Sequence, residues 1–153
     1  SLGNEGVTKA GDVQIMSAGT GITHGEWNKE AEDTRLYQIW IHPRTKGLKP
    51  RWETRQFPKE HEGLQLLVSG TKAEGVLYID SDAAIWGGHL GEGKTHEQHL
   101  AGAGYLLVSK GSVNVNGHDL RAGDGAVLQG ESLLSLKAHQ PSELLLIDLP
   151  SLQ

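Results

Sequence analysis

Short apolar runs separated by glycine-rich turns are the feature that most restricts the fold of this chain. Glycine accounts for 21 of the 153 residues, and the pattern is most regular after residue 63. Strands at such close spacing are typical of an all-β sandwich or a small jelly-roll barrel, and no helical periodicity competes with them. One further strand is expected within residues 81–93, and the others are Leu64–Val68, Val76–Ile79, Tyr105–Val108, Ser112–Val115, Gly125–Leu128, Leu133–Leu136 and Leu144–Leu149.

Two glycine dipeptides predict tight hairpins in this region. Asn116-Gly117 is typical of a type I′ turn, in which both central residues take a positive φ. Lys110-Gly111 stands between two of the apolar runs, so we expect a second hairpin there. Together these features predict one complete β-barrel from about residue 61 to the end of the chain.

The stretch 11–28 carries the strongest chemical signal. Val13 and Ile15 predict a short strand, which Gly19 and Gly21 interrupt before His24 and Glu26. Residues two apart point to the same side of a strand, so these last two side chains would aim an imidazole and a carboxylate at one point. Transition metals favour such donors, but two are too few for a tight site. The alternative is a surface histidine and a surface glutamate in a glycine-rich loop.

Residues 29–60 predict a loop, a strand and a linker. The charged run 29–34 is expected to be solvated, whereas residues 35–42, RLYQIWIH, are apolar on both faces and predict a strand that is buried on both sides. Pro43 ends this strand, and the proline-spaced, polar composition that follows suggests a domain boundary near residues 43–60.

A second histidine-rich stretch runs from His89 to His99. A metal site there would use His96 and His99 with His89 or Glu97, but neighbouring glycines argue against the helix that would bring the first two together. We therefore expect a polar loop that faces solvent. The four tryptophans at positions 27, 40, 52 and 86 are interpreted as core and inter-barrel packing residues.

Composition excludes several classes of function. The formal net charge of −5 and the pI of about 5.9 argue against a basic surface that binds nucleic acid. The chain has no cysteine, so it has no disulfide, thiolate ligand or cysteine nucleophile. No apolar run approaches the roughly 18 residues that a membrane-spanning helix requires. We expect a cytoplasmic protein with no direct nucleic-acid or membrane partner.

The segment SAGTGITHGEWN, followed by RLYQIWIHP, resembles the pirin family of cupin proteins, including its bacterial quercetinase-like members. Gly21, His24 and Asn28 match the second cupin motif, whereas Gly19 stands where proline is usual and Val13 where the first glycine is usual. The run NVNGHDLRAGDGAV resembles the pirin C-terminal domain. The resemblance implies the second half of an N-terminal barrel at residues 1–45, a linker at 46–60 and a complete C-terminal cupin barrel at 61–153.

The resemblance also implies a function. In pirins, His24 and Glu26 correspond to ligands of one divalent transition metal, which could be Fe, Ni, Cu, Mn or Zn, and Glu26 would also be the candidate catalytic base. The two other family ligands are histidines of an earlier HPHxGxE-type segment, which this sequence lacks. We therefore expect a fragment of a protein whose intact form resembles a quercetin 2,3-dioxygenase acting on a flavonol. The chain alone is expected to bind metal weakly and to be inactive.

Two other interpretations remain open: a regulatory or binding protein of the same fold without catalysis, and a degenerate cupin without metal function. An internal echo between residues 11–26 and 123–132 suggests a duplicated barrel whose second copy is metal-free. Strands near Val13–Met16 and Leu36–Ile41 would lack partners in half a barrel, so we also expect a homodimer that covers them. Two copies of His24 and Glu26 could then meet across the symmetry axis.

Overall fold

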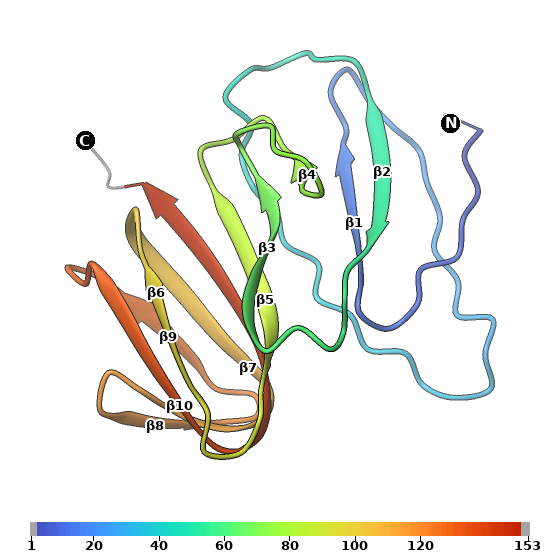
Figure 1. Ribbon diagram of the computed structural model, residues 1–153. Helices are drawn as coiled ribbons and strands as arrows, with labels where there is room; N and C mark the ends of the chain where they lie inside the picture. Colours follow the sequence, from blue (N-terminus) through green and yellow to red (C-terminus); the bar gives the residue numbers. More distant parts are fainter. Residues whose placement is uncertain (1–2, 151–153) are drawn as a thin grey trace.

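Ten β-strands and no helix make up residues 3–150, which are the residues that the computed structural model describes (Figure 1). The prediction of an all-β fold of cupin type is confirmed. The strands are β1 (Asp12–Ser17), β2 (Arg51–Gln56), β3 (Gly63–Ser69), β4 (Leu77–Tyr78), β5 (Ala84–Leu90), β6 (Thr95–His99), β7 (Gly102–Val115), β8 (His118–Arg121), β9 (Gly125–Leu128) and β10 (Leu133–Pro150).

The long strand β10 organises the larger sheet. That sheet has eight strands in the order β4-β3-β5-β10-β7-β8, with β6 paired to β10 and β9 paired to β7. One edge of β10 pairs with β7, while its other edge pairs first with β6, through residues 133–137, and then with β5, through residues 142–148. Register shifts between residues 138 and 144 interrupt its pairing with β7. These irregularities let one strand belong to both layers of the folded sheet seen in Figure 1.

The space inside this folded sheet is filled by aliphatic side chains. Leu106, Val108, Leu134 and Leu146 are completely or almost completely buried there. Burial of a side chain of this size contributes about 1.5–3 kcal/mol, so this cluster is the main source of stability of the C-terminal half. The strands expected at residues 64–68 and 125–128 are confirmed as β3 and β9.

The hairpin predicted at Lys110-Gly111 is wrong, because β7 runs unbroken through both residues. Gly111 has φ +83°, and a Cβ atom there would lie 2.3 Å from the backbone oxygen of Pro141. The dipeptide therefore forms an irregularity that bends β7 against β10, and the two runs that it was expected to separate belong to one strand. The runs 133–136 and 144–149 likewise belong to the single strand β10.

The turn predicted at Asn116-Gly117 is confirmed. Asn116 has φ 48° and Gly117 has φ 89°, as a type I′ turn requires, and the turn joins β7 to β8. The side chain of Asn114 supports the turn by accepting a hydrogen bond from the Gly117 N–H at 2.9 Å.

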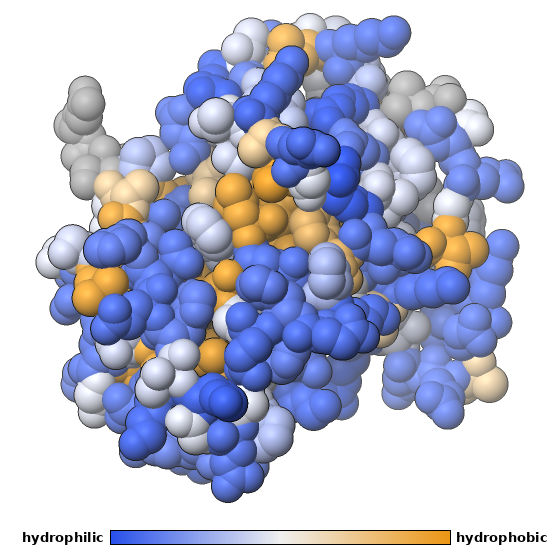
Figure 2. All heavy atoms as spheres, in the orientation of Figure 1, coloured by the Kyte–Doolittle hydropathy of each residue, from blue (hydrophilic) through white to orange (hydrophobic). Residues whose placement is uncertain are grey.

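Strands β1 and β2 form a separate antiparallel pair that packs on the outside of the larger sheet (Figure 1). Ile15 of β1 is 7 % exposed and belongs to a second apolar cluster with Leu67, Val68, Leu77 and Ile85. Figure 2 shows apolar atoms at the centre of the molecule in the region of β3 and β4, surrounded by hydrophilic side chains. β2 lies within the segment 46–60, for which the sequence predicts a linker, and it pairs with β1 in continuous register.

The strand predicted at residues 35–42 does not form. Residues 35–43 have no regular secondary structure, and Leu36, Tyr37 and Trp40 are 65 %, 56 % and 87 % exposed. A strand needs a partner backbone, and among residues 3–150 none pairs with this segment. The packing role expected for the tryptophans is also wrong for Trp27 and Trp40, since Trp27 is 79 % exposed. Trp86 does pack against the barrel core.

Candidate metal site at His24 and Glu26

His24 and Glu26 lie in an exposed loop that follows β1, not in a strand. Gly19 begins this loop with φ +54°, and a Cβ atom there would lie 1.9 Å from the backbone oxygen of Leu48. The N–H of Thr20 donates to that same oxygen at 3.0 Å. The start of the loop is thus held against residue 48, and the close approach explains why only glycine fits at position 19.

The carboxylate of Glu26 is tied back to β1. Oε1 of Glu26 accepts a hydrogen bond of 3.2 Å from Nε2 of Gln14, and Thr8 Oγ1 donates to Oε1 of the same glutamine at 3.4 Å. Neighbouring residues of a strand point to opposite faces. Ile15 packs in the apolar cluster, so the side chain of Gln14 points away from that cluster. The Glu26 carboxylate therefore lies on the side of the β1–β2 pair that faces away from the C-terminal barrel.

The donor set fits a divalent transition metal in kind but not in number. An imidazole and a carboxylate suit such ions, yet a stable protein site uses three or more protein ligands. Among residues 3–150, no group of three or more histidine, aspartate or glutamate side chains is placed to hold a metal ion. His24 and Glu26 therefore remain predicted ligands, and no reaction step through a metal follows from the geometry of the described residues.

The histidine-rich stretch 89–99 forms strand structure, so the loop predicted there is wrong. His89 belongs to β5, whereas His96 and His99 belong to β6, which pairs with β10. His96 and His99 are three apart in a strand and therefore point to opposite faces. His99 is exposed, while Nε2 of His96 is buried without a hydrogen-bond partner among the described residues. This geometry rules out a shared metal ion between the two rings.

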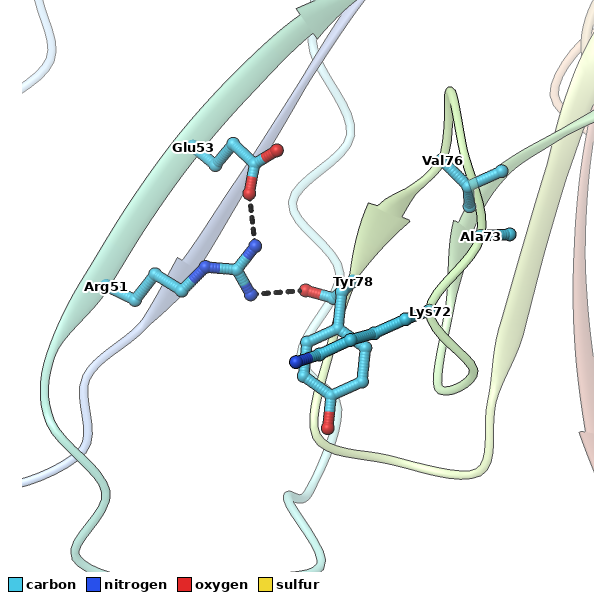
Figure 3. Close-up of a pocket in the computed structure, with 6 residues that line it drawn as sticks. All are labelled: Arg51, Glu53, Lys72, Ala73, Val76 and Tyr78. Carbon is cyan, nitrogen blue, oxygen red and sulfur yellow. Dashed lines mark hydrogen bonds and ion pairs between the residues drawn. The ribbon is translucent and has the colours of Figure 1, made fainter.

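A surface hollow of about 510 Å³ lies between β2 and the loop that leads into β4 (Figure 3). Arg51 donates to the backbone oxygen of Tyr78 at 2.8 Å and forms an ion pair with Glu53. The Arg51 guanidinium and the Lys72 ammonium lie 5.7 and 5.4 Å from the centre of the Tyr78 ring. These contacts fasten β2 to β4. Arg51 and Glu53, which line the hollow, lie opposite Ser17 and Ile15 in the register and share their face of the β1–β2 pair. The hollow is therefore on the opposite face from Glu26.

A second polar contact fastens the chain immediately after Pro43. The Thr45 N–H donates to Oδ2 of Asp80 at 2.9 Å, and Arg44 Nη1 donates to Oδ1 of Asp82 at 2.8 Å. The hydrogen bond from Thr45 holds the pKa of Asp80 below its ordinary value, with the Arg44 guanidinium acting in the same direction. Sequence reasoning missed this contact, because nothing in the local pattern relates residues that are 35 positions apart.

Two other carboxylates have perturbed ionisation and a structural role. Burial raises the pKa of Asp148, while hydrogen bonds from the N–H groups of Ala101 and Gly102 oppose the rise. The hydrogen bond from Asn114 lowers the pKa of Asp119, and His139, at 2.9 Å, adds to that effect. Both carboxylates join neighbouring parts of the barrel and lie apart in the fold from the loop of His24.

Comparison with known proteins identifies two family signatures. The chain matches the quercetinase C-terminal cupin domain over residues 66–149 and the pirin family over residues 1–41. It is 39 % identical over 153 residues to the quercetin 2,3-dioxygenase of Escherichia coli, a match that covers 98 % of this chain and 66 % of that protein. The chain thus spans just under two thirds of the length of this curated relative.

Two solved structures share the fold. The crystal structure of YhhW from Escherichia coli superposes with a TM-score of 0.91 at 37 % identity, covering 100 % of this chain and 66 % of that one. The structure of the bacterial pirin YhhW in complex with nickel(II) superposes with a TM-score of 0.84 at 35 % identity, covering 94 % of this chain and 63 % of that one.

Within residues 3–150, no helix is long and apolar enough to cross a membrane.

Proposed function

Because the chain belongs to the pirin family of cupin proteins, we propose that it works within a metal-dependent dioxygenase that resembles quercetin 2,3-dioxygenase. The observation that carries the proposal is the loop after β1, where His24 and Glu26 follow in the order of the family motif and Gln14 orients the Glu26 carboxylate. The name of the Escherichia coli relative supports a flavonol as the substrate class.

We propose His24 and Glu26 as metal ligands, with further donors supplied from outside residues 3–150. The nickel(II) complex of the YhhW relative supports a divalent transition metal and leaves Fe, Ni, Cu, Mn and Zn as candidates for this chain. A bound metal of this kind lowers the pKa of a hydroxyl group that coordinates it. Glu26 is the proposed base that accepts the flavonol proton, because its carboxylate is exposed and held by a hydrogen bond from a neutral amide.

A non-catalytic regulatory or binding role is the second candidate. It is favoured by one observation, namely that no group of three or more histidine, aspartate or glutamate side chains within residues 3–150 is placed to hold a metal ion. A fold of this family can serve either function, so the chemistry of the completed site decides between them.

The proposed organisation keeps the division into a partial N-terminal barrel at residues 1–45, a linker at 46–60 and a C-terminal barrel at 61–153. Residues 1–2 and 151–153 of these units lie outside the described part. The pairing of β2 with β1 means that the linker also contributes to the N-terminal unit. We further propose a cytoplasmic homodimer without a nucleic-acid or membrane partner. Its support is the net charge of −5 and the exposed apolar segment 35–41.

A chimeric enzyme tests the catalytic proposal. This chain replaces the aligned residues of the Escherichia coli quercetin 2,3-dioxygenase, and metal content and quercetin consumption are measured. Turnover that is lost in His24→Ala and Glu26→Gln but kept in Glu30→Gln, an exposed glutamate of the same region, supports the dioxygenase. A folded chimera that binds metal without consuming quercetin supports the regulatory role and overturns the enzymatic one.

A further inference from the structure

The Asn116-Gly117 turn combines a favourable hairpin conformation with a chemically labile sequence. In an asparagine–glycine dipeptide the backbone nitrogen of the glycine can attack Cγ of the asparagine, because glycine has no Cβ atom to hinder the approach. The new C–N bond closes a succinimide ring. The Cγ–Nδ2 bond breaks, and ammonia leaves with the proton of the glycine N–H. Water then opens the ring to aspartate or isoaspartate, so position 116 is open to spontaneous modification.

The side chain of Asn116 is held by β10 and by the residues that precede it. Its Oδ1 accepts a hydrogen bond of 2.7 Å from the Ser135 N–H. Its Nδ2 donates to the backbone oxygen of Leu133 at 3.3 Å and to Oε2 of Glu131 at 3.4 Å. Closure of the ring would move Cγ onto the nitrogen of Gly117 and expel Nδ2, so the reaction disrupts all three contacts. The docked side chain is therefore stabilised against the reaction.

The attacking nitrogen is also occupied in the folded chain. The Gly117 N–H donates a hydrogen bond of 2.9 Å to Oδ1 of Asn114, and this nitrogen becomes a nucleophile only when it loses its proton. The Asn114 side chain is fixed in turn, because its Nδ2 donates to Oδ1 of Asp119 at 2.6 Å. A carboxylate only accepts hydrogen bonds, so Asp119 determines that the oxygen of the Asn114 amide faces Gly117.

The product of the reaction does not fit the same contacts. Aspartate at position 116 has a second carboxylate oxygen where asparagine has the Nδ2 donor. That oxygen would face the backbone oxygen of Leu133 and the carboxylate of Glu131, so two donated hydrogen bonds become repulsive contacts. Isoaspartate also lengthens the backbone by one methylene group, which disturbs the register of the hairpin between β7 and β8.

We propose that Asn116 is a deamidation site that the folded barrel keeps closed, and that its deamidation is a one-way mark of unfolding. Local opening of the turn frees both the side chain and the attacking nitrogen. A chain that has reacted in the open state cannot rebuild the contacts between the turn and β10, so the damage is irreversible. The site belongs to the C-terminal barrel, where β8 lies far from β1 and β2 (Figure 1). The proposal is independent of the metal chemistry and of the homodimer.

Deamidation rates of the full chain and of a peptide test the closed state. The peptide has the sequence of residues 113–120, VNVNGHDL, and serves as the unfolded reference in the same mildly alkaline buffer. Mass spectrometry with peptide mapping measures the conversion of the amide to the acid at position 116. The folded chain is expected to react more slowly by a factor of about 100 or more, because the reaction requires local opening. Equal rates in the chain and the peptide overturn the proposal.

Asn114→Ala tests the protection of the attacking nitrogen. The variant is expected to deamidate at Asn116 about tenfold faster than the parent, the factor that a hydrogen bond of ordinary strength contributes to an equilibrium constant. His139→Ala is the matched control, because it removes the contact of His139 with Asp119 and leaves the acceptor of the Gly117 N–H in place. Far-UV spectra show that both variants are folded. A rate for Asn114→Ala no greater than that for His139→Ala overturns the protective role of residue 114.

Asn116→Asp tests the consequence of the modification. Aspartate suits the same turn, so the variant changes the contacts with residues 131 and 133 while keeping the backbone conformation. It is expected to unfold at a lower urea concentration than the parent at neutral pH. Asn116→Gly is the control, since glycine keeps the positive φ and removes the amide without adding a charge. An Asn116→Asp variant that is less stable than Asn116→Gly supports the repulsion, whereas one as stable as the parent overturns the one-way mark.

Discussion

Gln14 donates a hydrogen bond of 3.2 Å to the Glu26 carboxylate, and this contact links the first strand to the loop that carries both candidate ligands. The hydrogen bond from the Gln14 amide orients the carboxylate. The contact holds this part of the loop against β1, although the two residues are twelve positions apart in the sequence.

The isolated chain is expected to bind nickel(II) weakly and to leave quercetin unoxidised. Two donors cannot hold the ion as tightly as a site with three or four. Isothermal titration with nickel(II), together with the metal content of the purified chain, measures this. Stoichiometric metal that is lost in His24→Ala would contradict the prediction and would mean that the site is completed in another way.

Gln14→Leu is expected to weaken metal binding by the chimeric enzyme by about tenfold or more, since groups that orient a ligand commonly contribute this much. The change removes the donor to Glu26 and keeps a side chain of similar size. Gln56→Leu on β2 is the control, because Gln56 lies opposite Asp12 in the register and shares that face of the pair. Equal metal affinities for Gln14→Leu and Gln56→Leu would contradict the prediction that Gln14 positions Glu26.

Gly111→Ala is expected to lower the free energy of unfolding by about 3 kcal/mol, because the added Cβ atom combines steric overlap with an unfavourable backbone conformation. The overlap is with the backbone oxygen of Pro141, 2.3 Å from the position of that atom. Urea unfolding followed by circular dichroism measures the loss.

Gly117→Ala is the matched control for Gly111→Ala. Its φ is +89°, but a Cβ atom there would have no heavy atom within 4 Å. Only the conformational cost remains, about 1 kcal/mol. Equal losses for the two variants would show that the overlap with β10 is relieved by a small shift of the strand.

The carboxylate of Asp80 predicts a pH dependence of stability. Its pKa is lowered in the folded chain, chiefly by the hydrogen bond from the Thr45 N–H. A group whose folded pKa is depressed stabilises the fold above its unfolded pKa, and this stabilisation disappears as the pH falls through the folded value. Asp80→Asn is therefore expected to be less stable than the parent at neutral pH and to lose less stability as the pH falls below about 4, the ordinary pKa of an aspartate.

Unfolding midpoints in urea measured across that range check the Asp80 prediction. Asp33→Asn is the control, since Asp33 lies in an exposed loop and forms no ion pair within residues 3–150. If the urea midpoints of the parent and of Asp80→Asn decrease equally as the pH falls, the contact between residues 45 and 80 does not contribute to stability.

Local sequence determined the turn at Asn116-Gly117 and the fold class. Asn116-Gly117 predicts its own backbone conformation, because positive φ at two successive residues is a property of those residues. The apolar runs predict all-β structure for the same reason, since a period of two is visible within each run. The segment SAGTGITHGEWN, followed by RLYQIWIHP, was sufficient to identify the family, and within it His24 and Glu26 remain the predicted ligands.

Only the tertiary structure decided which apolar runs become strands and which residues meet. Residues 35–42 carry as strong a strand pattern as residues 64–68, yet β3 has neighbours on both sides and the earlier segment has none within residues 3–150. Lys110-Gly111 has the composition of a hairpin turn but forms an irregularity, because β10 continues alongside it. Backbone conformation is governed by neighbouring residues, whereas pairing and burial depend on backbones that are remote in the sequence. The contacts of Gln14 with Glu26 and of Thr45 with Asp80 join residues that are remote in the sequence. The sequence therefore did not predict which residues make these contacts.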